Sequence, residues 1–325
     1  MRFNKLDLNL LVALDSMLSL QSISRAAERL HMSQSAMSNA LARLREYFED
    51  DLLVQVGRKM ELTARAETLR DAVRDVLLRV DTTITAQPRF DPALSDREFH
   101  ISVSDYTMAT LMPHLLALAG AQSKTLRFRL SPQVGQPELA LERGEADLLV
   151  VPKAYCSPDH PLETLFEEHF CCAVWRDSRI AAAELTFDVY AEAGHVVMQP
   201  PGDARPAFES WFMQRFGVAR RVEVTTYSFV AAPMLVIGTE RVATIHGRLA
   251  RQLAPGLPIA LRPLPLPMPA MEQAMQWHKY RSTDPGLSWL RRLVLAAVAR
   301  MDADDRLSTV VGSTPAARAN TAPAP

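Results

Sequence analysis

The chain has 325 residues, which suits two or three domains, and its 48% hydrophobic content is ample for packed cores. Its 36 Lys and Arg against 37 Asp and Glu give a formal net charge of -1, so an argument for a nucleic-acid partner must rest on where the charges lie. We expect no export signal or membrane span, because Asn9, Asp15 and Ser16 interrupt the apolar stretch at 8–20. A cytoplasmic protein is therefore expected.

The first 48 residues predict three short helices around one core. Their apolar faces recur at helical spacing and comprise Leu10, Leu14, Leu18, Ile23, Ala26, Ala27, Leu30, Met37, Leu41, Leu44 and Phe48. Ser22 or Ser24 caps the second helix, and Ser33 caps the third. The small pair Ala26 and Ala27 lets the second helix approach its neighbour closely, as a helix-turn-helix requires.

The third helix carries polar residues at its start and on the face away from that core. They are Ser33, Gln34, Ser35, Ser38, Asn39 and Arg43, with Arg45 further along. Gln and Asn can bond adenine bidentately, Ser is permissive, and Arg suits guanine or phosphate. We interpret the segment as a DNA-reading helix-turn-helix; a solvated amphipathic hairpin of helices is the alternative.

Two very short strands follow, at 53–56 and 60–62, joined by the basic turn Gly57-Arg58-Lys59. This pattern is typical of a winged helix-turn-helix. A wing beside a recognition helix usually lies against phosphates or the minor groove, which makes Arg58 and Lys59 DNA-binding candidates. A surface hairpin with random charges is the alternative.

With these residues in view, the chain resembles the LysR-type transcriptional regulators over nearly its whole ordered length. The matching segments are Leu6-Asp-Leu-Asn-Leu-Leu11, Ala26-Ala27, Ser33 to Ser38, Leu41 to Arg45 and Asp51-Leu-Leu53. Further segments are most similar to flavonoid-responsive nodulation regulators and to regulators of aromatic-compound degradation: Met1-Arg-Phe3 with Leu6 to Asp15, Phe90-Asp-Pro92, Leu264 to Pro267, and Trp277. One departure is Ser35, where the family usually has Pro; serine restores an N–H and adds a hydroxyl in the first helical turn.

Thr63 can cap a long helix that runs to about residue 86. Its apolar stripe repeats at spacings of four, three, four and four: Leu69, Val73, Val76, Val80 and Ile84. Such a seam pairs with another helix, and a helix-turn-helix that reads two half-sites needs a dimer. The resemblance implies that this linker supplies the dimer and that dimers pair further. Burial against the chain's own second domain is the alternative.

Beyond the Pro88 to Pro92 joint, strands and helices alternate in an α/β pattern with parallel strands. Strands are expected at 99–104, 126–130, 147–151, 170–175, 195–198, 222–226 and 242–245. Helices are expected at 107–119, 137–143, 187–193, 208–216, from Phe229, at 247–253 and at 285–301. The return of the chain at 271–277 suggests two lobes joined by crossing segments, like the periplasmic binding proteins that the family's effector domain resembles.

We therefore expect a multidomain chain. An all-α winged helix-turn-helix DNA-binding domain at 1–63 precedes a linker and dimerisation helix at 64–87 and a hinge at 88–96. A two-lobed α/β effector domain at 97–302 follows, with lobe 1 at 97–169 and 272–302 and lobe 2 at 170–271. The Ala-, Thr-, Ser- and Pro-rich segment 303–325 is expected to be a disordered tail.

A cleft between two such lobes suits a small molecule, because strand ends and helix N-termini converge there beside apolar walls. The candidates at those ends are Ser104, Asp105, Tyr106, Thr107, His169, Arg205, Tyr227, Ser228, Phe229, His246 and Arg248. The resemblance implies that Thr107, Thr110, Leu111, His169, Arg205 and Arg248 approach the effector. A lone His or Arg is often only a structural hydrogen-bonder. Together these residues predict a largely apolar ligand, phenolic or anionic.

Three cysteines, Cys156, Cys171 and Cys172, form neither a disulfide framework nor a metal-ligand spacing, and buried strand positions are favoured over a redox sensor. No nucleophile with its base and no phosphate loop is visible, so we expect no enzyme, cofactor or metal. The expected function is effector-controlled transcription regulation, by resemblance usually activation. Expected partners are double-stranded DNA, the effector, a second copy and, by resemblance, RNA polymerase, in the bacterial cytoplasm at the nucleoid. A solute-binding protein or an enzyme on the two-lobed fold is the disfavoured alternative.

Overall fold

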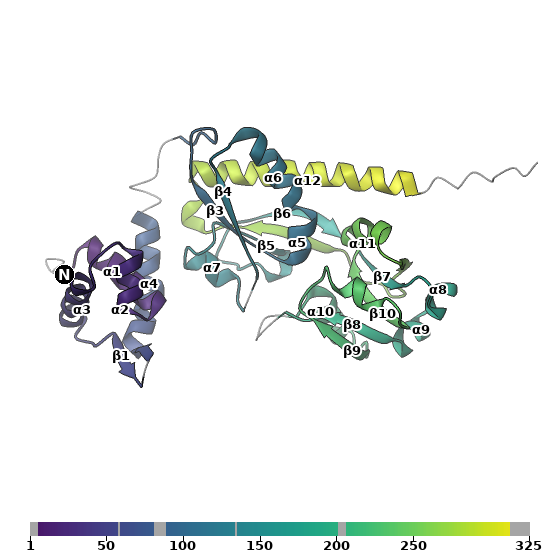
Figure 1. Ribbon diagram of the computed structural model, residues 1–325, viewed down its shortest axis with the longest axis horizontal. Helices are drawn as coiled ribbons and strands as arrows, with labels where there is room; N and C mark the ends of the chain where they lie inside the picture. Colours follow the sequence, from purple (N-terminus) through teal and green to yellow (C-terminus); the bar gives the residue numbers. More distant parts are fainter. Residues whose placement is uncertain (1–5, 58, 81–88, 134, 201–205, 313–325) are drawn as a thin grey trace, which may run out of the picture.

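The computed structural model describes residues 6–57, 59–80, 89–133, 135–200 and 206–312 (Figure 1). It has an N-terminal helical domain, a linker helix and two sheet-containing lobes. The predicted fold class, a winged helix-turn-helix domain joined by a helix to a two-lobed α/β domain, is confirmed. The positions of the linker helix and of the two lobes determine where the functional features of the chain lie.

The N-terminal domain consists of α1 (Leu8–Leu20), α2 (Ile23–Arg29) and α3 (Gln34–Phe48), followed by the hairpin of β1 (Leu53–Val56) and β2 (Lys59–Leu62). Serine caps set two of these boundaries. The Ser22 hydroxyl accepts from the Arg25 N–H and that of Ser33 from the Ala36 N–H, which decides between the two candidate caps of α2. Met37, Leu41 and Leu44 are buried in the shared core, as the stripe predicts.

The linker helix α4 (Ala64–Val80) begins at Thr63, whose hydroxyl accepts from the Ala66 N–H and donates to Asp50. The structure divides the expected dimerisation stripe. Val73 is buried in the core of the N-terminal domain and Leu69 packs against it, because α4 lies along α1, whereas Val76 is exposed. The first half of the stripe is therefore covered by the N-terminal domain itself, and not by the second domain as the alternative had it. Ile84 lies outside the described residues.

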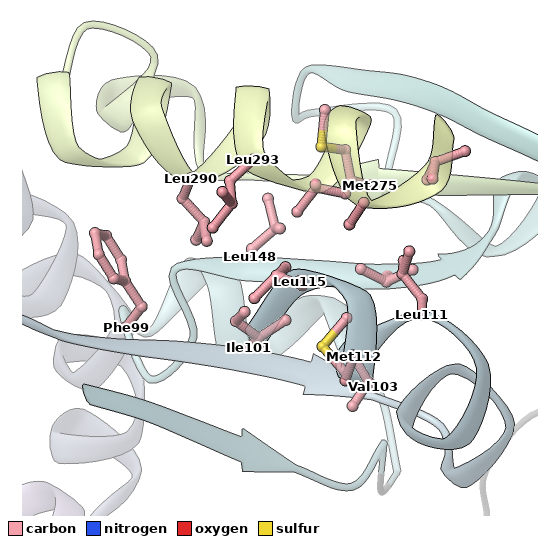
Figure 2. Packing of buried hydrophobic residues seen from close by; sticks show 14 of the residues in the cluster. Phe99, Ile101, Val103, Leu111, Met112, Leu115, Leu148, Met275, Leu290 and Leu293 are labelled. Carbon is pink, nitrogen blue, oxygen red and sulfur yellow. The ribbon is translucent and has the colours of Figure 1, made fainter. Parts of the chain in front are cut away.

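Lobe 1 is a five-stranded sheet in the order β4-β3-β5-β12-β6. Its strands are β3 (Glu98–Val103), β4 (Arg127–Ser131), β5 (Leu148–Pro152), β6 (Leu162–Glu168) and β12 (Met271–Gln276). Its helices are α5 (Asp105–Thr110), α6 (Met112–Gln122), α7 (Glu138–Glu142) and α12 (Pro285–Gly312). Figure 2 shows the apolar core of this lobe, in which Leu290 and Leu293 of α12 lie near Leu115 of α6 and Ile101 of β3.

Lobe 2 is a second five-stranded sheet in the order β11-β7-β10-β8-β9. Its strands are β7 (Phe170–Trp175), β8 (Gly194–Met198), β9 (Arg221–Thr226), β10 (Arg241–His246) and β11 (Ile259–Pro263). Its helices are α8 (Arg179–Ala182), α9 (Phe187–Glu192), α10 (Phe208–Arg215) and α11 (Gly247–Leu253).

Short 3-10 turns in the two lobes lie at η2 (Lys153–Tyr155), η3 (Ala232–Val236), η4 (Ala254–Gly256) and η5 (Lys279–Arg281).

The structure differs from the expected layout at several elements. The sheets are mixed, because β12 runs antiparallel to β5 and β6, and β10 runs antiparallel to β7. The helix expected at 107–119 is two helices, since Pro113 lacks the N–H that would continue the first and suits the start of the next. The helix expected from Phe229 is the 3-10 turn η3, which contains Pro233. Strands β6 and β11 were not predicted.

The tail expected from residue 303 begins as helix. α12 runs to Gly312, and ion pairs support its extension: Asp302 accepts from Arg248 at 2.6 Å, and Asp305 accepts from Arg251 at 2.7 Å. A composition-based reading of this segment could not include these partners, which come from α11. Residues 313–325 lie outside the described residues.

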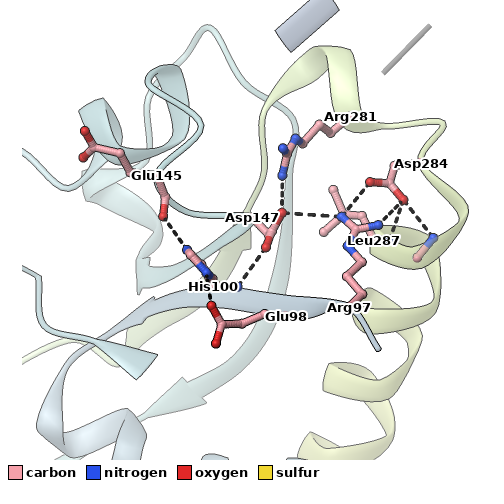
Figure 3. A network of polar contacts seen from close by, with 9 residues as sticks. Arg97, Glu98, His100, Glu145, Asp147, Arg281, Asp284 and Leu287 are labelled. Carbon is pink, nitrogen blue, oxygen red and sulfur yellow. Dashed lines mark hydrogen bonds and ion pairs between the residues drawn. The ribbon is translucent and has the colours of Figure 1, made fainter. Parts of the chain in front are cut away.

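A polar network anchors the start of lobe 1 to the start of α12 (Figure 3). Arg97 binds both carboxylate oxygens of Asp284 at 2.8 Å, and Asp284 also accepts from the Leu287 N–H. Asp147 accepts from the His100 N–H at 2.8 Å and binds Arg281. Burial alone would raise the pKa of Asp284, but the hydrogen bond and charge of Arg97 outweigh it and lower that pKa.

Candidate DNA-binding surface and ligand pocket

The polar face of α3 is open to solvent. The six residues predicted on it, Ser33, Gln34, Ser35, Ser38, Asn39 and Arg43, are all exposed. Ser35, which stands in the first turn of α3, lies 3.0 Å from the cap Ser33, oxygen to oxygen. Arg43 lies 3.5 Å from Asp7, but both side chains are about half exposed, so this pair leaves the guanidinium accessible.

Arg45 has a structural position that the sequence did not reveal. Its Nε donates to the Asp51 carbonyl at 2.8 Å and its guanidinium donates to the Leu53 carbonyl at 2.7 Å, so it joins the recognition helix to the start of the wing. Lys59 opens β2 and is exposed. Arg58 lies outside the described residues. A basic side chain on α3 therefore fixes the position of the wing relative to the helix.

A pocket of about 350 Å³ lies between the two lobes. Lobe 1 contributes the ends of β3, β5 and β12 with the segment before α7, and lobe 2 contributes the end of β8, the segments flanking α10 and β9, and His246. Its apolar walls include Val103, Val151, Met198, Phe208, Phe229 and Met271. A volume of this size falls within the range of small-molecule sites.

Two buried polar side chains of this pocket have an atom with no hydrogen-bond partner among the described residues. Gln273 is 2% exposed; its amide N–H donates to Thr107 at 3.3 Å, while its Oε1 accepts from nothing. His246 is 4% exposed and its Nδ1 has no partner. Burial lowers the pKa of His246 to about 3, so the ring is neutral. Unpartnered buried polar atoms are costly, and a ligand in the pocket is one way to satisfy them.

Tyr106 and His246 form one aromatic wall. Their rings stack at 3.9 Å between centroids, and Phe229 meets His246 edge-on at 4.7 Å. Behind this wall the buried Glu168 accepts from the Tyr106 hydroxyl and from the His169 and Arg248 N–H groups. Burial raises the pKa of Glu168 despite these bonds. Glu168 ends β6, where the chain crosses to lobe 2, so the wall is fixed to the crossing point.

Seven of the candidates for effector binding line the pocket: Ser104, Asp105, Tyr106, Tyr227, Ser228, Phe229 and His246. Five others do not line it: Thr107, Thr110, Leu111, His169 and Arg248. Leu111 is in the lobe 1 core, Thr110 bonds the Tyr106 carbonyl, and Arg248 is engaged by Glu168 and Asp302. Arg205 lies outside the described residues. Arg248 lies in α11, directly after β10, and its side chain points toward α12. It therefore does not reach the pocket, although its position in the sequence motif matches a ligand-binding residue of the family.

Sequence reasoning missed several lining residues, of which Gln133, Glu138, Tyr155 and Gln273 are polar. Gln133 donates to the Val150 carbonyl at 2.5 Å. Gln273 stands in β12, where burial is nearly continuous, and a polar residue in such a strand is a usable signal of a polar site. Its strand was read only as the return of the chain.

Nothing in the described residues points to metal or thiol chemistry. No group of three or more His, Cys, Asp or Glu side chains in that part of the chain could hold a metal ion. Burial raises the pKa of Cys156 to about 11 and that of Cys171 to about 12, which keeps both as unreactive thiols. Across the described segments, no helix has the length and apolar character needed to cross a membrane.

A winged helix-turn-helix with an open polar face, joined to a two-lobed domain, is the architecture of a DNA-binding regulator. Comparison with known families agrees. The family described as "Bacterial regulatory helix-turn-helix protein, lysR family" matches residues 8–67. The family described as "LysR substrate binding domain" matches residues 92–299. The chain belongs to the lysR family of transcriptional regulators, and it is not an enzyme.

Relatives of similar length carry the name nodulation protein. Nodulation protein D 1 of Bradyrhizobium diazoefficiens is 37% identical over 306 residues, covering 94% of this chain and 98% of that protein. Nodulation protein D 1 of Sinorhizobium fredii is 38% identical over 303 residues, covering 93% and 94%. The chain is therefore similar to the nodulation subgroup, as its motifs predicted.

Among solved structures, a probable transcriptional regulator from Pseudomonas aeruginosa is 27% identical, covers 90% of this chain and 97% of its own, and superimposes with a TM-score of 0.63. Full-length OxyR from the same organism has a TM-score of 0.69 over 90% of this chain and 94% of its own. At 18% identity, that second likeness concerns the fold alone.

Proposed function

We propose that the chain is a cytoplasmic, dimeric, effector-controlled transcription activator whose small-molecule ligand binds between its two lobes. The observation that carries the ligand assignment is the interlobe pocket, with buried Gln273 and His246 atoms left without partners among the described residues. The likeness to nodulation regulators supports activation. Contact with RNA polymerase, further pairing of dimers and a place at the nucleoid belong to the same proposal.

The pocket favours an uncharged ligand that is largely apolar and carries a hydrogen-bond donor. Gln273 Oε1 can only accept, so the ligand must supply an O–H or N–H to it. His246 is neutral and stacks on Tyr106, which favours an aromatic ring over an anion. The charged side chains among the described lining residues are Asp105 and Glu138, and both are acids. We therefore favour the phenolic expectation over the anionic one.

Activation follows if the ligand binds one arrangement of the lobes better than another. Such a ligand can shift the balance of arrangements only by its difference in affinity for them. In a dimer, a change in the effector domains alters the spacing or angle of two recognition helices and so their fit to two half-sites. DNA binding and ligand binding are then coupled through the linker helix.

Genome-wide mapping of the DNA that the chain binds, followed by transcription from those promoters, tests the proposal. Transcription should rise with an uncharged hydroxylated aromatic compound in the wild-type strain and stay low in a strain without the gene. Equal transcription in both strains across such compounds would contradict it. Turnover of a compound by the purified chain would point instead to a catalytic use of the pocket.

A further inference from the structure

The short helix α7 lies at the side of lobe 1 that faces the linker helix α4 (Figure 1). At its first end, Pro137 and Glu138 line the pocket. At its other end, the turn at 143–145 contacts α4, whose face there carries Asp71, Arg74 and Leu78. One short segment, residues 137–145, therefore touches both the pocket and the helix that carries the DNA-binding domain.

The contact between that turn and α4 has both apolar and charged parts. Gly144 has a φ of +62°, and a Cβ there would lie 4.0 Å from the Leu78 side chain. Leu78 is 7% exposed, so the turn covers it. Arg143 lies 3.8 Å from Asp71, and Glu145 accepts from the Arg74 guanidinium at 2.9 Å.

Arg74 is shared by the two domains. Its side chain is 9% exposed, and its Nε donates to Asp15 of α1 at 2.8 Å while another nitrogen donates to Ser19 of the same helix. The remaining contact goes to Glu145 of lobe 1. A guanidinium is planar and rigid, so its partners on α1 and on the turn are held in one fixed relation.

The helix and its turn are tied together internally. The N–H groups of Glu145 and Ala146 both donate to the Ala140 carbonyl, at 2.8 and 2.9 Å. Leu141 is fully buried in a small cluster with Ala146 and Val151, and Val151 also lines the pocket. A displacement at the pocket end of α7 is therefore carried to Glu145 instead of being absorbed on the way.

We propose that α7 and its turn transmit the state of the pocket to the DNA-binding domain, with the contact Glu145–Arg74–Asp15 as the point of transfer. This inference rests on the proposed function, because it takes the pocket as the effector site. Movement of α7 shifts Glu145 and therefore the position of α1 and α4 against lobe 1. The recognition helix α3 shares its core with α1, so it moves with them.

The effect of the pocket on the DNA-binding domain through this contact is expected to be modest. Glu145 is 53% exposed, and ion pairs of that exposure are worth little in isolation. A pair of that strength corresponds to a change of roughly two- to fivefold in an equilibrium or an exchange rate.

Hydrogen exchange of the full chain, read on the amides of α1 and α7, tests the transfer without a known effector. Ala207→Phe and Met198→Trp each enlarge a side chain on the lobe 2 wall of the pocket and stand in for an occupant; Ala207 is 7% exposed and Met198 is half-buried. Each is measured alone and with Glu145→Gln. Glu272→Gln is the matched control, because Glu272 forms an exposed 2.8 Å pair with Lys153 that does not involve α4.

A folded pocket-filling variant should change exchange in both α7 and α1, the latter by about two- to fivefold. With Glu145→Gln the α7 change should remain and the α1 change should disappear, whereas Glu272→Gln should alter neither. An unchanged α1 in the wild-type background, or an α1 change that persists with Glu145→Gln, would overturn the proposal. The proposed function would survive that result, since it is decided separately by transcription.

Discussion

Asp105 and Ser228 join the two lobes beside the pocket. The Ser228 hydroxyl donates to Asp105 Oδ2 at 2.6 Å, and the Val230 N–H donates to the same oxygen at 3.2 Å. Asp105 opens α5 in lobe 1, whereas Ser228 and Val230 follow β9 in lobe 2. Both Asp105 and Ser228 line the pocket, so this carboxylate helps both to hold the lobes together and to shape the site.

Loss of that contact should loosen the lobe 2 side of the pocket. In Ser228→Ala the free energy of opening at the amides of Val230 and Ala231 should fall by about 1–2 kcal/mol, because a hydrogen bond to a charged group is lost and the Ala231 N–H loses its Ser228 acceptor. Native-state hydrogen exchange measures it. Ser38→Ala, on the exposed face of α3, is the control. An unchanged opening free energy at both amides would show that the contact does not hold the lobes.

Substitutions in the recognition helix and in the wing should affect DNA binding differently, because the first remove base-specific contacts and the second remove positive charge. Gln34→Ala and Asn39→Ala should each cost about 1–3 kcal/mol on cognate DNA and relax base choice, because their amides can pair with base edges. Arg58→Ala or Lys59→Ala should weaken binding to all sequences and flatten the salt dependence. Titrations on cognate and random DNA at several salt concentrations supply the comparison. Equal losses on both DNAs for all four variants would refute the assignment of α3.

The buried amide of Gln273 should lower the free energy of unfolding of the ligand-free protein. Gln273→Leu removes a buried amide whose Oε1 has no partner among the described residues, so the unfolding midpoint should rise, by the equivalent of about 1 kcal/mol. Thr107 keeps its contact with Ser104 at 3.2 Å in that variant. Thermal unfolding without added compounds is the measurement. A fall in stability would mean that the amide is satisfied in solution and that the pocket has no free acceptor.

His246 should make the fold sensitive to acid. Its folded-state pKa of about 3 lies below the ordinary value of 6.5, so the unfolded chain takes up the proton first and stability falls as pH drops from about 6.5 toward 3. At pH 5 this amounts to about 2 kcal/mol. His246→Phe keeps the ring stack on Tyr106, and its loss of stability between pH 7.5 and 5 should be smaller than that of the wild type by about that amount. Urea unfolding at the two pH values compares them, and equal losses would contradict the neutral, buried assignment.

Local signals made much of the fold predictable. Ser33 and Thr63 predict helix starts, because a hydroxyl at the N-cap accepts a hydrogen bond from a free N–H of the first turn. The structure has both caps. The stripe from Met37 to Leu44 predicted which face of α3 is buried, and the structure has that face in the core. Motif resemblance gave the family.

The remaining features depend on contacts between residues far apart in the chain. Asp105 meets Ser228 across 123 positions and Arg74 meets Glu145 across 71, and neither pair has a local pattern. The same limit explains Arg248. Its place after β10 suggested the pocket, yet its charge is taken up by Asp302 of α12, one residue beyond the expected end of that helix.

The most direct test of the account is transcription from a promoter bound by the chain, measured with uncharged hydroxylated aromatic compounds for the wild type and for Gln273→Leu. The account predicts that at least one compound raises transcription in the wild type, and that the response is lost or shifted to about tenfold higher concentration in the variant, because the ligand's donor loses its acceptor. DNA binding without compound should be equal in the two proteins. A variant that responds at the same concentration as the wild type, or a wild type that responds only to anionic compounds, would contradict the assignment of the pocket.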